Sequence, residues 1–405
     1  MSKPRISTPL IVIYLTAILD AVGIGLVFPI LPSLLEDVTG TADIAALVGV
    51  VAALYAAMQF VLAPVLGALS DRVGRRPVLL VSLAGAVASY LFLAVAPTLW
   101  MLLIGRALAG MTSASVSVAS AYVTDITPPE QRARRFGLLN AMFGLGFIVG
   151  PVLGGGLGDH WLRLPFLVAA VLNGGNFLIA LLVLPESRTP EGGRIDLAAL
   201  NPLRPLRWAV TLKGLLPIIL VVFLLSATGE AYGVCWALWG GDAFGWDGLW
   251  IGLSLGTFGL CQALAQALLP GPAVRLLGET GAILLGIAGV SAALVVMAFT
   301  TAGWLVFAVM PVFALGGIGV PALQSLATRR ADDSLQGRFQ GVVASTVSLA
   351  SIVAPLGFSS LYFLVRQAWP GAIWLSVVAL YAIAIPFVLG LRTRSTEPAP
   401  SMPSP

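Results

Sequence analysis

Twelve long apolar runs follow one another along the chain, and they constrain its fold more than any other feature. A membrane-spanning helix needs about 20 largely apolar residues, and each run is close to that length. In lipid the backbone must satisfy its own hydrogen bonds, so such runs form helices. The runs cover roughly residues 9–32, 44–69, 78–96, 99–122, 136–158 and 164–184 in the first half, and 214–238, 248–270, 281–300, 303–326, 339–364 and 371–391 in the second.

The composition excludes an ordinary soluble protein. Hydrophobic residues make up 58% of the 405 residues and charged residues only 10%, whereas soluble domains are about 25% charged. The first apolar run is too long for the core of a cleavable signal and lacks a small-residue cleavage site. We therefore predict an all-α integral membrane protein with 12 transmembrane helices.

The basic residues predict the orientation in the membrane. A net charge of +4 could suggest a nucleic-acid partner, but all of the 22 basic residues except Arg106, Arg163 and Arg366 fall on the side of the N-terminus. Cytoplasmic loops concentrate Lys and Arg. The pattern predicts a multi-pass membrane protein with both termini in the cytoplasm, whose partner is the lipid bilayer and not nucleic acid.

A polar stretch, residues 186–213, separates two sets of six runs. Its Pro, Arg, Glu and Asp residues (PESRTPEGGRID) predict a cytoplasmic linker between an N-terminal half, residues 1–185, and a C-terminal half, residues 214–392. The Pro- and Ser-rich residues 393–405 predict a disordered cytoplasmic tail. A shift of 204 residues favours a tandem repeat of the halves, since it takes Gly67 to Gly271, Gly74 to Gly278, Gly137 to Gly341 and Pro151 to Pro355.

The loop GALSDRVGRR, between the second and third runs, concentrates charge in a chain that has little of it. Asp71 can pair with basic groups or cap a helix N-terminus, while Gly67 and Gly74 permit close approach and sharp turning. A loop that only sets topology needs neither the acid nor the glycines, so we interpret the loop as a cytoplasmic gate; a topogenic loop is the alternative. Its basic members are Arg72, Arg75 and Arg76.

The fifth run carries glycines at four-residue intervals. This spacing puts them on one face of a helix, so that a partner helix can approach closely, and Pro151 adds a site for a kink. The equivalent eleventh run keeps Pro355 without the ridge, which suggests a directional role. The glycines are Gly146, Gly150, Gly154 and Gly158.

Three ionisable residues lie within the runs, where each charge is costly. Asp20 and Arg106 could form a structural pair or serve transport. Desolvation favours the neutral form of an unpaired carboxyl, which suits Glu230 for taking up and releasing a proton, although it could also face water.

Uncharged polar side chains at depth are candidates for lining a substrate cavity, although most single amides only bond a neighbouring helix. Gln262 and Gln266 share one helix face and would meet a ligand together. For Trp236 and Trp239, an interfacial position and a cavity wall are both open, with the interface favoured. The candidate amides are Gln59, Asn140, Asn173, Asn176, Gln262, Gln266 and Gln324.

Other chemistry finds little support in the sequence. His160 is the only histidine and falls in a predicted periplasmic loop, so neither a metal site nor a histidine-based triad is expected. Cys235 and Cys261 lie in apolar runs and are expected to be core residues. There is no P-loop motif. We expect no enzymatic activity and no cofactor, and an ion gradient as the energy source.

These motifs resemble those of the major facilitator superfamily. GALSDRVGRR resembles its loop signature, RALAG around Arg106 its fourth-helix motif, and GPVLGG, which holds Gly150, Pro151, Gly154 and Gly155, the fifth-helix motif of its drug/proton antiporters. The chain looks most like the tetracycline/proton antiporters around Asp20 (LDAVGIGLVFPILPSLL), Gln59 and Gln266 (FGLCQALAQALLPGP). The resemblance implies that Asp71 and Arg75 act in the gate, and that Asp20, Gln59, Arg106 and Gln266 are functional positions.

Three positions depart from the resembled family. Ser89 stands where those antiporters carry an acid in the third helix, Gln262 where they carry a histidine in the eighth, and Val290 where they carry an acid in the ninth. In the family these positions are tied to proton coupling and drug binding. Glu230 is a candidate for the replacement proton site.

We therefore expect a proton-coupled antiporter that exports a small amphipathic drug, tetracycline-like, by alternating access around a cavity near the bilayer midplane. A transporter of another drug or metabolite is the first alternative, and a membrane sensor that no longer transports is the second. The substrate, the stoichiometry, the acid that carries the proton and the oligomeric state stay open, with a monomer as the working expectation.

Overall fold

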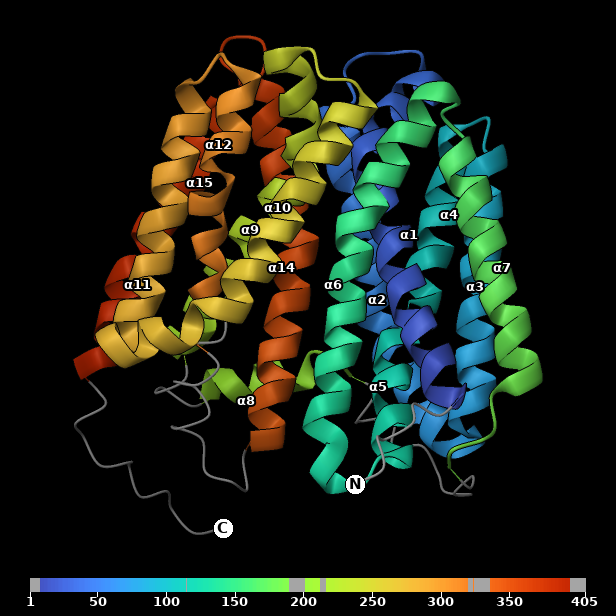
Figure 1. Cartoon of the computed structure of the whole chain (residues 1–405). Coiled ribbons are helices and arrows are strands. Elements are labelled where there is room, and N and C mark those ends of the chain that lie inside the picture. Colours follow the sequence, from blue (N-terminus) through green and yellow to red (C-terminus); the bar gives the residue numbers. More distant parts are fainter. Residues whose placement is uncertain are drawn as a thin grey trace.

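The chain folds into a bundle of long helices that stand side by side (Figure 1). This computed structural model describes residues 8–113, 115–188, 201–211, 216–319, 323 and 336–393. Gln324, the tail after residue 393, and residues 189–200 and 212–215 of the expected linker lie outside them. Within the described residues, eleven helices are long and apolar enough to cross a membrane, and Gly303–Ile318 is a shorter apolar helix. The predicted all-α membrane fold is confirmed.

The helices overlap the predicted runs, and several extend beyond them, with α6 beginning at Pro129 before the run 136–158 and α11 at Pro270 before the run 281–300. The fourth run is divided into two helices, α4 and α5, and His160 ends a helix instead of lying in a loop. The helices of the first half are α1 (Thr8–Thr39), α2 (Ala45–Val73), α3 (Arg75–Val95), α4 (Leu99–Thr112), α5 (Ser115–Ile126), α6 (Pro129–His160) and α7 (Leu164–Val183). They are followed by α8 (Arg204–Thr211), α9 (Leu216–Phe244), α10 (Gly248–Leu268), α11 (Pro270–Phe299), α12 (Gly303–Phe313), the 3-10 helix η1 (Ala314–Ile318), α14 (Gln336–Val365) and α15 (Ala372–Thr393).

Two glycines with left-handed backbone mark equivalent points of the two halves. Gly74 has φ 103° between α2 and α3, and Gly278 has φ 72° at a kink inside α11. Residues with a Cβ rarely adopt such angles. The two positions are 204 residues apart, which is the shift that the sequence suggested. The exact limits of the halves and the linker stay a prediction.

The apolar core is continuous between the halves at one end of the bundle and divided at the other. At the periplasmic end a single cluster includes both Val48 of α2 and Trp236 of α9. Toward the cytoplasmic end there are two separate clusters, one around Leu79 of α3 and one around Ile283 of α11. The halves therefore meet at the periplasmic end and separate toward the cytoplasm, as the ribbon shows (Figure 1).

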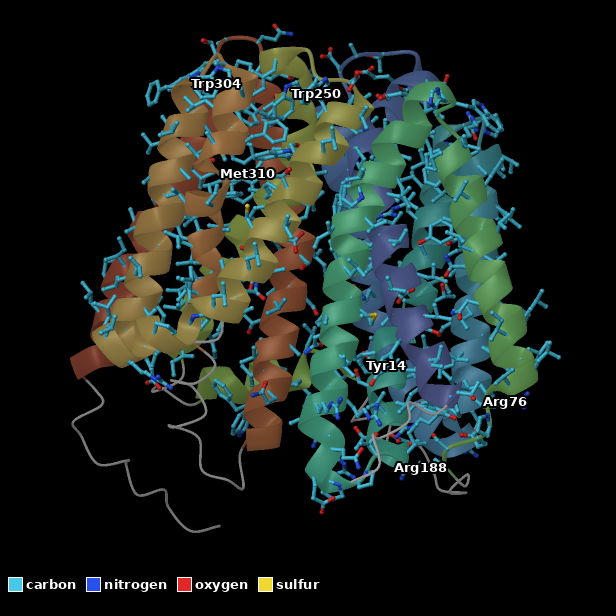
Figure 2. The ribbon with its side chains drawn as sticks, in the orientation of Figure 1. Tyr14, Arg76, Arg188, Trp250, Trp304 and Met310 are labelled. Atoms are coloured by element: carbon cyan, nitrogen blue, oxygen red, sulfur yellow. The ribbon has the colours of Figure 1, made fainter. Side chains whose placement is uncertain are left out.

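Exposed side chains at the two ends agree with this orientation. Trp250 and Trp304 are exposed at one end of the bundle, whereas Arg76 and Arg188 lie at the opposite end (Figure 2). Tryptophan is enriched at membrane interfaces, and arginine at the cytoplasmic side. The end that carries Arg76 is therefore the cytoplasmic one.

Candidate functional site

The main cavity lies between the halves and has a volume of about 1020 Å³. Its walls come from α6 and Phe28 of α1 in the first half, and from α9 and α10 in the second. The wall residues of α6 extend from Pro151, near mid-helix, to Gly137 near the cytoplasmic end, and those of α10 from Leu255 to Ala267. We call this space the central cavity. It occupies the cytoplasmic half of the interface, so the structure is an inward-facing one.

On the periplasmic side of the cavity, α6 and α10 are in backbone contact. A methyl group at Gly155 would collide with the carbonyl group of Gly248, and one at Gly252 would collide with the carbonyl of Pro151. A methyl at Gly256 would lie 2.7 Å from Val152. Gly248, Gly252 and Gly256 recur every four residues and so form one face of α10. Glycines thus permit the approach that closes this side.

A carboxylate from α6 completes the closure. Asp159 accepts hydrogen bonds from the backbone nitrogens of Gly248 at 2.9 Å and Leu249 at 2.8 Å. These are the first N–H groups of α10, which have no partner within the helix. The next backbone N–H group of α10, that of Trp250, donates to the Asp247 carboxylate at 2.9 Å. Asp159 therefore joins the two halves through the N-terminus of α10, and we call this contact the periplasmic clasp.

The pseudo-symmetric contact joins α2 and α14. A methyl group at Gly49 would lie 2.5 Å from the carbonyl oxygen of Pro355. Beyond it, Arg366 binds both carboxylate oxygens of Asp242, at 2.7 and 2.9 Å, and donates across to the carbonyl oxygen of Ala42 at 3.2 Å. The α6–α10 and α2–α14 pairs thus close on the same side of the bilayer.

Glu230 of α9 is the acidic side chain among the described residues that line the central cavity. Ser351 Oγ of α14 donates to its Oε1 at 2.6 Å. No basic residue belongs to the described lining. The carboxyl therefore faces the cavity and is held by a hydroxyl, without an ion pair among the described residues.

Asp20 and Arg106 share a small cavity of about 30 Å³ inside the first half, together with Ser89. Ser115 Oγ donates to Asp20 Oδ2 at 2.5 Å, and the Arg106 guanidinium lies 4.8 Å from the centre of the Tyr55 ring. Among the described residues, the salt bridges do not include an Asp20–Arg106 pair, and Arg106 Nε is buried without a hydrogen-bond partner. Of the two alternatives for these residues, the structural pair is not formed directly.

The charged loop organises the cytoplasmic end of the first half around Arg75. This buried guanidinium binds Asp71 at 2.7 Å, Asp125 of α5 at 3.1 Å and Ser70 Oγ at 2.6 Å. Glu186 accepts from the backbone nitrogens of Arg75 and Arg76, at 2.8 and 3.1 Å. All of these partners belong to α2, α3, α5 or the segment after α7.

The remaining members of that loop have simpler surroundings. Asp71 also accepts from Arg188 at 3.0 Å, and Arg76 donates to the Leu181 carbonyl at 2.7 Å. Arg72 is exposed, and the Gly67 carbonyl accepts from Ser70 Oγ. In this inward-facing form the charged loop therefore holds the helices of one half together.

The glycine ridge of α6 faces α1. Methyl groups at Gly146 and Gly154 would collide with the carbonyl groups of Ile18 and Leu26, and one at Gly150 would lie 2.7 Å from the carbonyl oxygen of Val22. One face of α6, with the Pro151 ring against Gly25, thus packs on α1, while Gly155 and the Pro151 carbonyl group face α10. The ridge fixes α6 within its own half.

The predicted cavity residues divide into three groups. Asn140, Gln262 and Gln266 belong to the lining of the central cavity, whereas Gln59 of α2 is half-buried outside its described lining. Asn173 and Asn176 are buried in α7.

Trp236 lies neither at the membrane interface nor in the cavity wall. It is 1% exposed, its ring packs at a tilt against those of Trp239 and Trp374, and it donates to Ser254 Oγ at 2.8 Å. Its placement as a cavity residue is therefore wrong, and so is the interfacial alternative. Tyr232, one turn earlier on α9, takes the wall position. Because α9 is apolar on all sides, periodicity did not reveal which face looks inward.

The sequence did not identify four features of these contacts, namely Asp159, Asp125, Glu186 and the glycine face of α10. The glycine face of α10 was visible as a four-residue repeat in GLWIGLSLG. The three acids lie at or near helix ends, where carboxylates are common. Only their partners, which are far away in the sequence, set them apart from other acids at helix ends. Within the described residues, no group of three His, Cys, Asp or Glu side chains could hold a metal ion.

Comparison with known proteins agrees with this architecture. Residues 13–355 match the family model of the Major Facilitator Superfamily. The tetracycline resistance protein of class C from Escherichia coli is 48% identical over 389 residues, covering 96% of this chain and 98% of that protein. The class G protein from Vibrio anguillarum is 42% identical, covering 91% and 94%. The solved structure of the nucleoside transporter NupG superposes with a TM-score of 0.80 at 11% identity, covering 95% of this chain and all of that one, a likeness of fold alone.

Proposed function

Since the chain belongs to the major facilitator superfamily, and within it to the tetracycline resistance proteins, we propose that it exports a tetracycline-like drug in exchange for protons. It is a multi-pass protein of the bacterial inner membrane and a transporter, not an enzyme. The observation that carries the proposal is the similarity to tetracycline resistance proteins, at 48% and 42% identity over nearly the whole chain. The inward-facing central cavity adds a place in which a drug from the cytoplasm could bind.

We propose that Glu230 carries the exchanged proton. The Glu230 carboxylate supplies the negative charge of the described cavity wall, and a proton neutralises it. A proton and a positively charged drug would therefore compete for this carboxylate. Competition of this kind produces antiport when each ligand favours a different conformation. Moving one charge through 100 mV yields about 2.3 kcal/mol, which can drive the drug against its gradient.

The other predicted sites have supporting roles in this proposal. Asn140, Gln262 and Gln266 would bind polar groups of the drug, and Asp20 with Arg106 would balance charge within the first half. Asp71 and Arg75 would belong to the cytoplasmic gate, and Gly150, Pro151, Gly154 and Gly155 to the segment of α6 that packs closely on α1 and α10.

The test is uptake of tetracycline into inverted membrane vesicles under an imposed pH gradient. We expect uptake that a protonophore abolishes and that Asp71→Asn reduces. The departures at Ser89, Gln262 and Val290 favour one competing function, export of a different compound. Folded protein that takes up no tetracycline, while another drug is taken up under the same gradient, would establish that alternative.

A further inference from the structure

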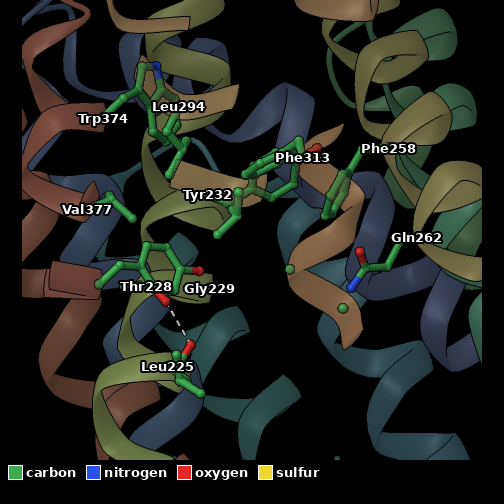
Figure 3. Close-up of a pocket in the computed structure, with 14 residues that line it drawn as sticks. Leu225, Thr228, Gly229, Tyr232, Phe258, Gln262, Leu294, Phe313, Trp374 and Val377 are labelled. Carbon is green, nitrogen blue, oxygen red and sulfur yellow. Dashed lines mark hydrogen bonds between the residues drawn. The ribbon is translucent and has the colours of Figure 1, made fainter. Parts of the chain in front are cut away.

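A second cavity lies inside the C-terminal half, beside the central cavity (Figure 3). Its volume is about 260 Å³. The two cavities share Gly229, Tyr232, Phe258 and Gln262 in their walls, so they adjoin one another. We call it the side cavity. A cavity of about 150 Å³ in a protein core accommodates benzene, so this one has room for a substituted aromatic ring.

The walls of the side cavity are aromatic and uncharged. The rings of Tyr232, Phe258 and Phe313 contact one another, with centres 4.5 to 5.5 Å apart, and Trp374 and Tyr381 also line the cavity. No ionisable carboxylate or basic side chain belongs to the described lining. Such walls favour a flat neutral ring and disfavour a charged group, which would lose its hydration.

Unpartnered polar atoms are concentrated in this cavity. The described residues contain nine buried side-chain nitrogen or oxygen atoms without a hydrogen-bond partner. The three in the C-terminal half are Tyr232 Oη, Gln262 Oε1 and Trp374 Nε1, and all three residues line the side cavity. Trp374 is 1% exposed. Buried polar groups are normally paired, so their common position indicates a ligand that completes them.

The backbone is also unusual at this place. The wall is formed partly by η1, a 3-10 segment in the tenth span. Irregular backbone at membrane depth is tolerated where it lines a cavity, and interrupted helices commonly form the binding sites of transporters. A methyl group at Gly317 would lie 2.6 Å from the Gln262 amide nitrogen. Glycine at this position therefore lets the Gln262 amide extend into the wall, as Figure 3 shows.

We propose that the side cavity is a binding subsite for an uncharged aromatic ring that carries a hydroxyl group. Trp374 can only donate, the Gln262 oxygen can only accept, and Tyr232 can do either. A hydroxyl both donates and accepts, and therefore suits this set. The link to export rests on the proposed function: the ring would be the neutral end of the exported compound, while its charged end occupies the central cavity near Glu230.

Binding can be tested without transport. The probe is 4-fluorophenol, and its binding to the purified protein in lipid nanodiscs is followed by fluorine NMR, with ionised 4-fluorobenzoate as the comparison. Val290→Phe fills the side cavity, and Val296→Phe, at an exposed position of the same helix, is the matched control. We expect saturable binding of the phenol alone, weakened about tenfold or more by Val290→Phe and unchanged by Val296→Phe.

Leu294→Phe, a smaller change in the same wall, replaces Val290→Phe if size-exclusion chromatography shows that the latter does not fold. The absence of saturable binding to the wild type, equal binding to a folded filling variant, or equal binding of the benzoate would each overturn the subsite.

Transport separates this proposal from the proposed function. We expect the filling variant to raise the KM for tetracycline about tenfold while uptake stays dependent on the pH gradient. An unchanged KM in a variant that no longer binds the phenol would refute the link between the subsite and export. If the wild type binds the phenol but takes up no tetracycline, the proposed function fails and the subsite stands.

Discussion

Removal of the periplasmic clasp should shift the protein toward its outward-facing form. Asp159 accepts two hydrogen bonds from the N-terminus of α10, and both join the halves. A hydrogen bond to a charged group contributes about 1.5–3 kcal/mol. Because the clasp is exposed to solvent, we take about 2 kcal/mol for the two bonds together. Asp159→Ala should therefore change the ratio of inward-facing to outward-facing molecules about 30-fold.

The populations can be measured by electron paramagnetic resonance distances across the periplasmic end. Spin labels at Glu36 and Thr301, both exposed, would report the separation of the halves in a background from which Cys235 and Cys261 have been removed. The matched control is Asp37→Ala, which breaks the 3.0 Å pair with Arg163 at the same end but within one half. A wild-type distribution in Asp159→Ala, or an equal shift in the control, would refute the reasoning.

Three further predictions follow from the cavity, the α6–α10 contact and the charged loop. Glu230→Gln should remove the pH dependence of tetracycline uptake but leave exchange of drug for drug, whereas Ser351→Ala should keep the pH dependence; a wild-type pH profile in vesicles of Glu230→Gln would contradict the assignment of the proton. Gly155→Ala should cost about 1–3 kcal/mol of packing and slow transport, while Gly156→Ala, whose methyl meets only ordinary contact at 3.6 Å, should transport normally; equal rates would show that α6 and α10 need no backbone contact. Arg75→Lys should lower the free energy of unfolding by about 1–3 kcal/mol, because a lysine cannot bind Asp71 and Asp125 together as the guanidinium does. An unchanged melting temperature would show that the Asp125 contact is dispensable.

The sequence predicted the helices well because each apolar run had to cross a membrane. One interruption was predictable: Gly278 lies between the runs 248–270 and 281–300 and is equivalent to Gly74, and the structure has a kink there inside α11. The 3-10 segment η1 inside the run 303–326 was not predictable, because hydropathy along one helix is insensitive to the packing between helices.

Site residues were predictable where a repeat carried the signal and unpredictable where a helix had no polar face. Gln262 and Gln266 lie four residues apart, and both line the central cavity. Tyr232 and Trp236 of α9 also lie four residues apart, yet only Tyr232 belongs to the cavity wall. A helix that is apolar all round does not reveal its inward face. Likewise, the sequence could not show that Asp20 bonds Ser115 and not Arg106.

The same two helices that close the periplasmic side also carry the means to close the cytoplasmic side. The cavity wall of α6 includes Gly137, Ala141 and Gly144, and the facing wall of α10 includes Gly259 and Ala263. Residues three or four apart lie on one helix face, so each wall presents small side chains. Small residues let helices approach closely within a membrane. Rocking the halves about mid-helix would therefore replace the contact at Gly155 and Gly252 by one between these walls. The glycine ridge that packs on α1 lies on a different face of α6. Such a motion therefore needs no repacking within the first half.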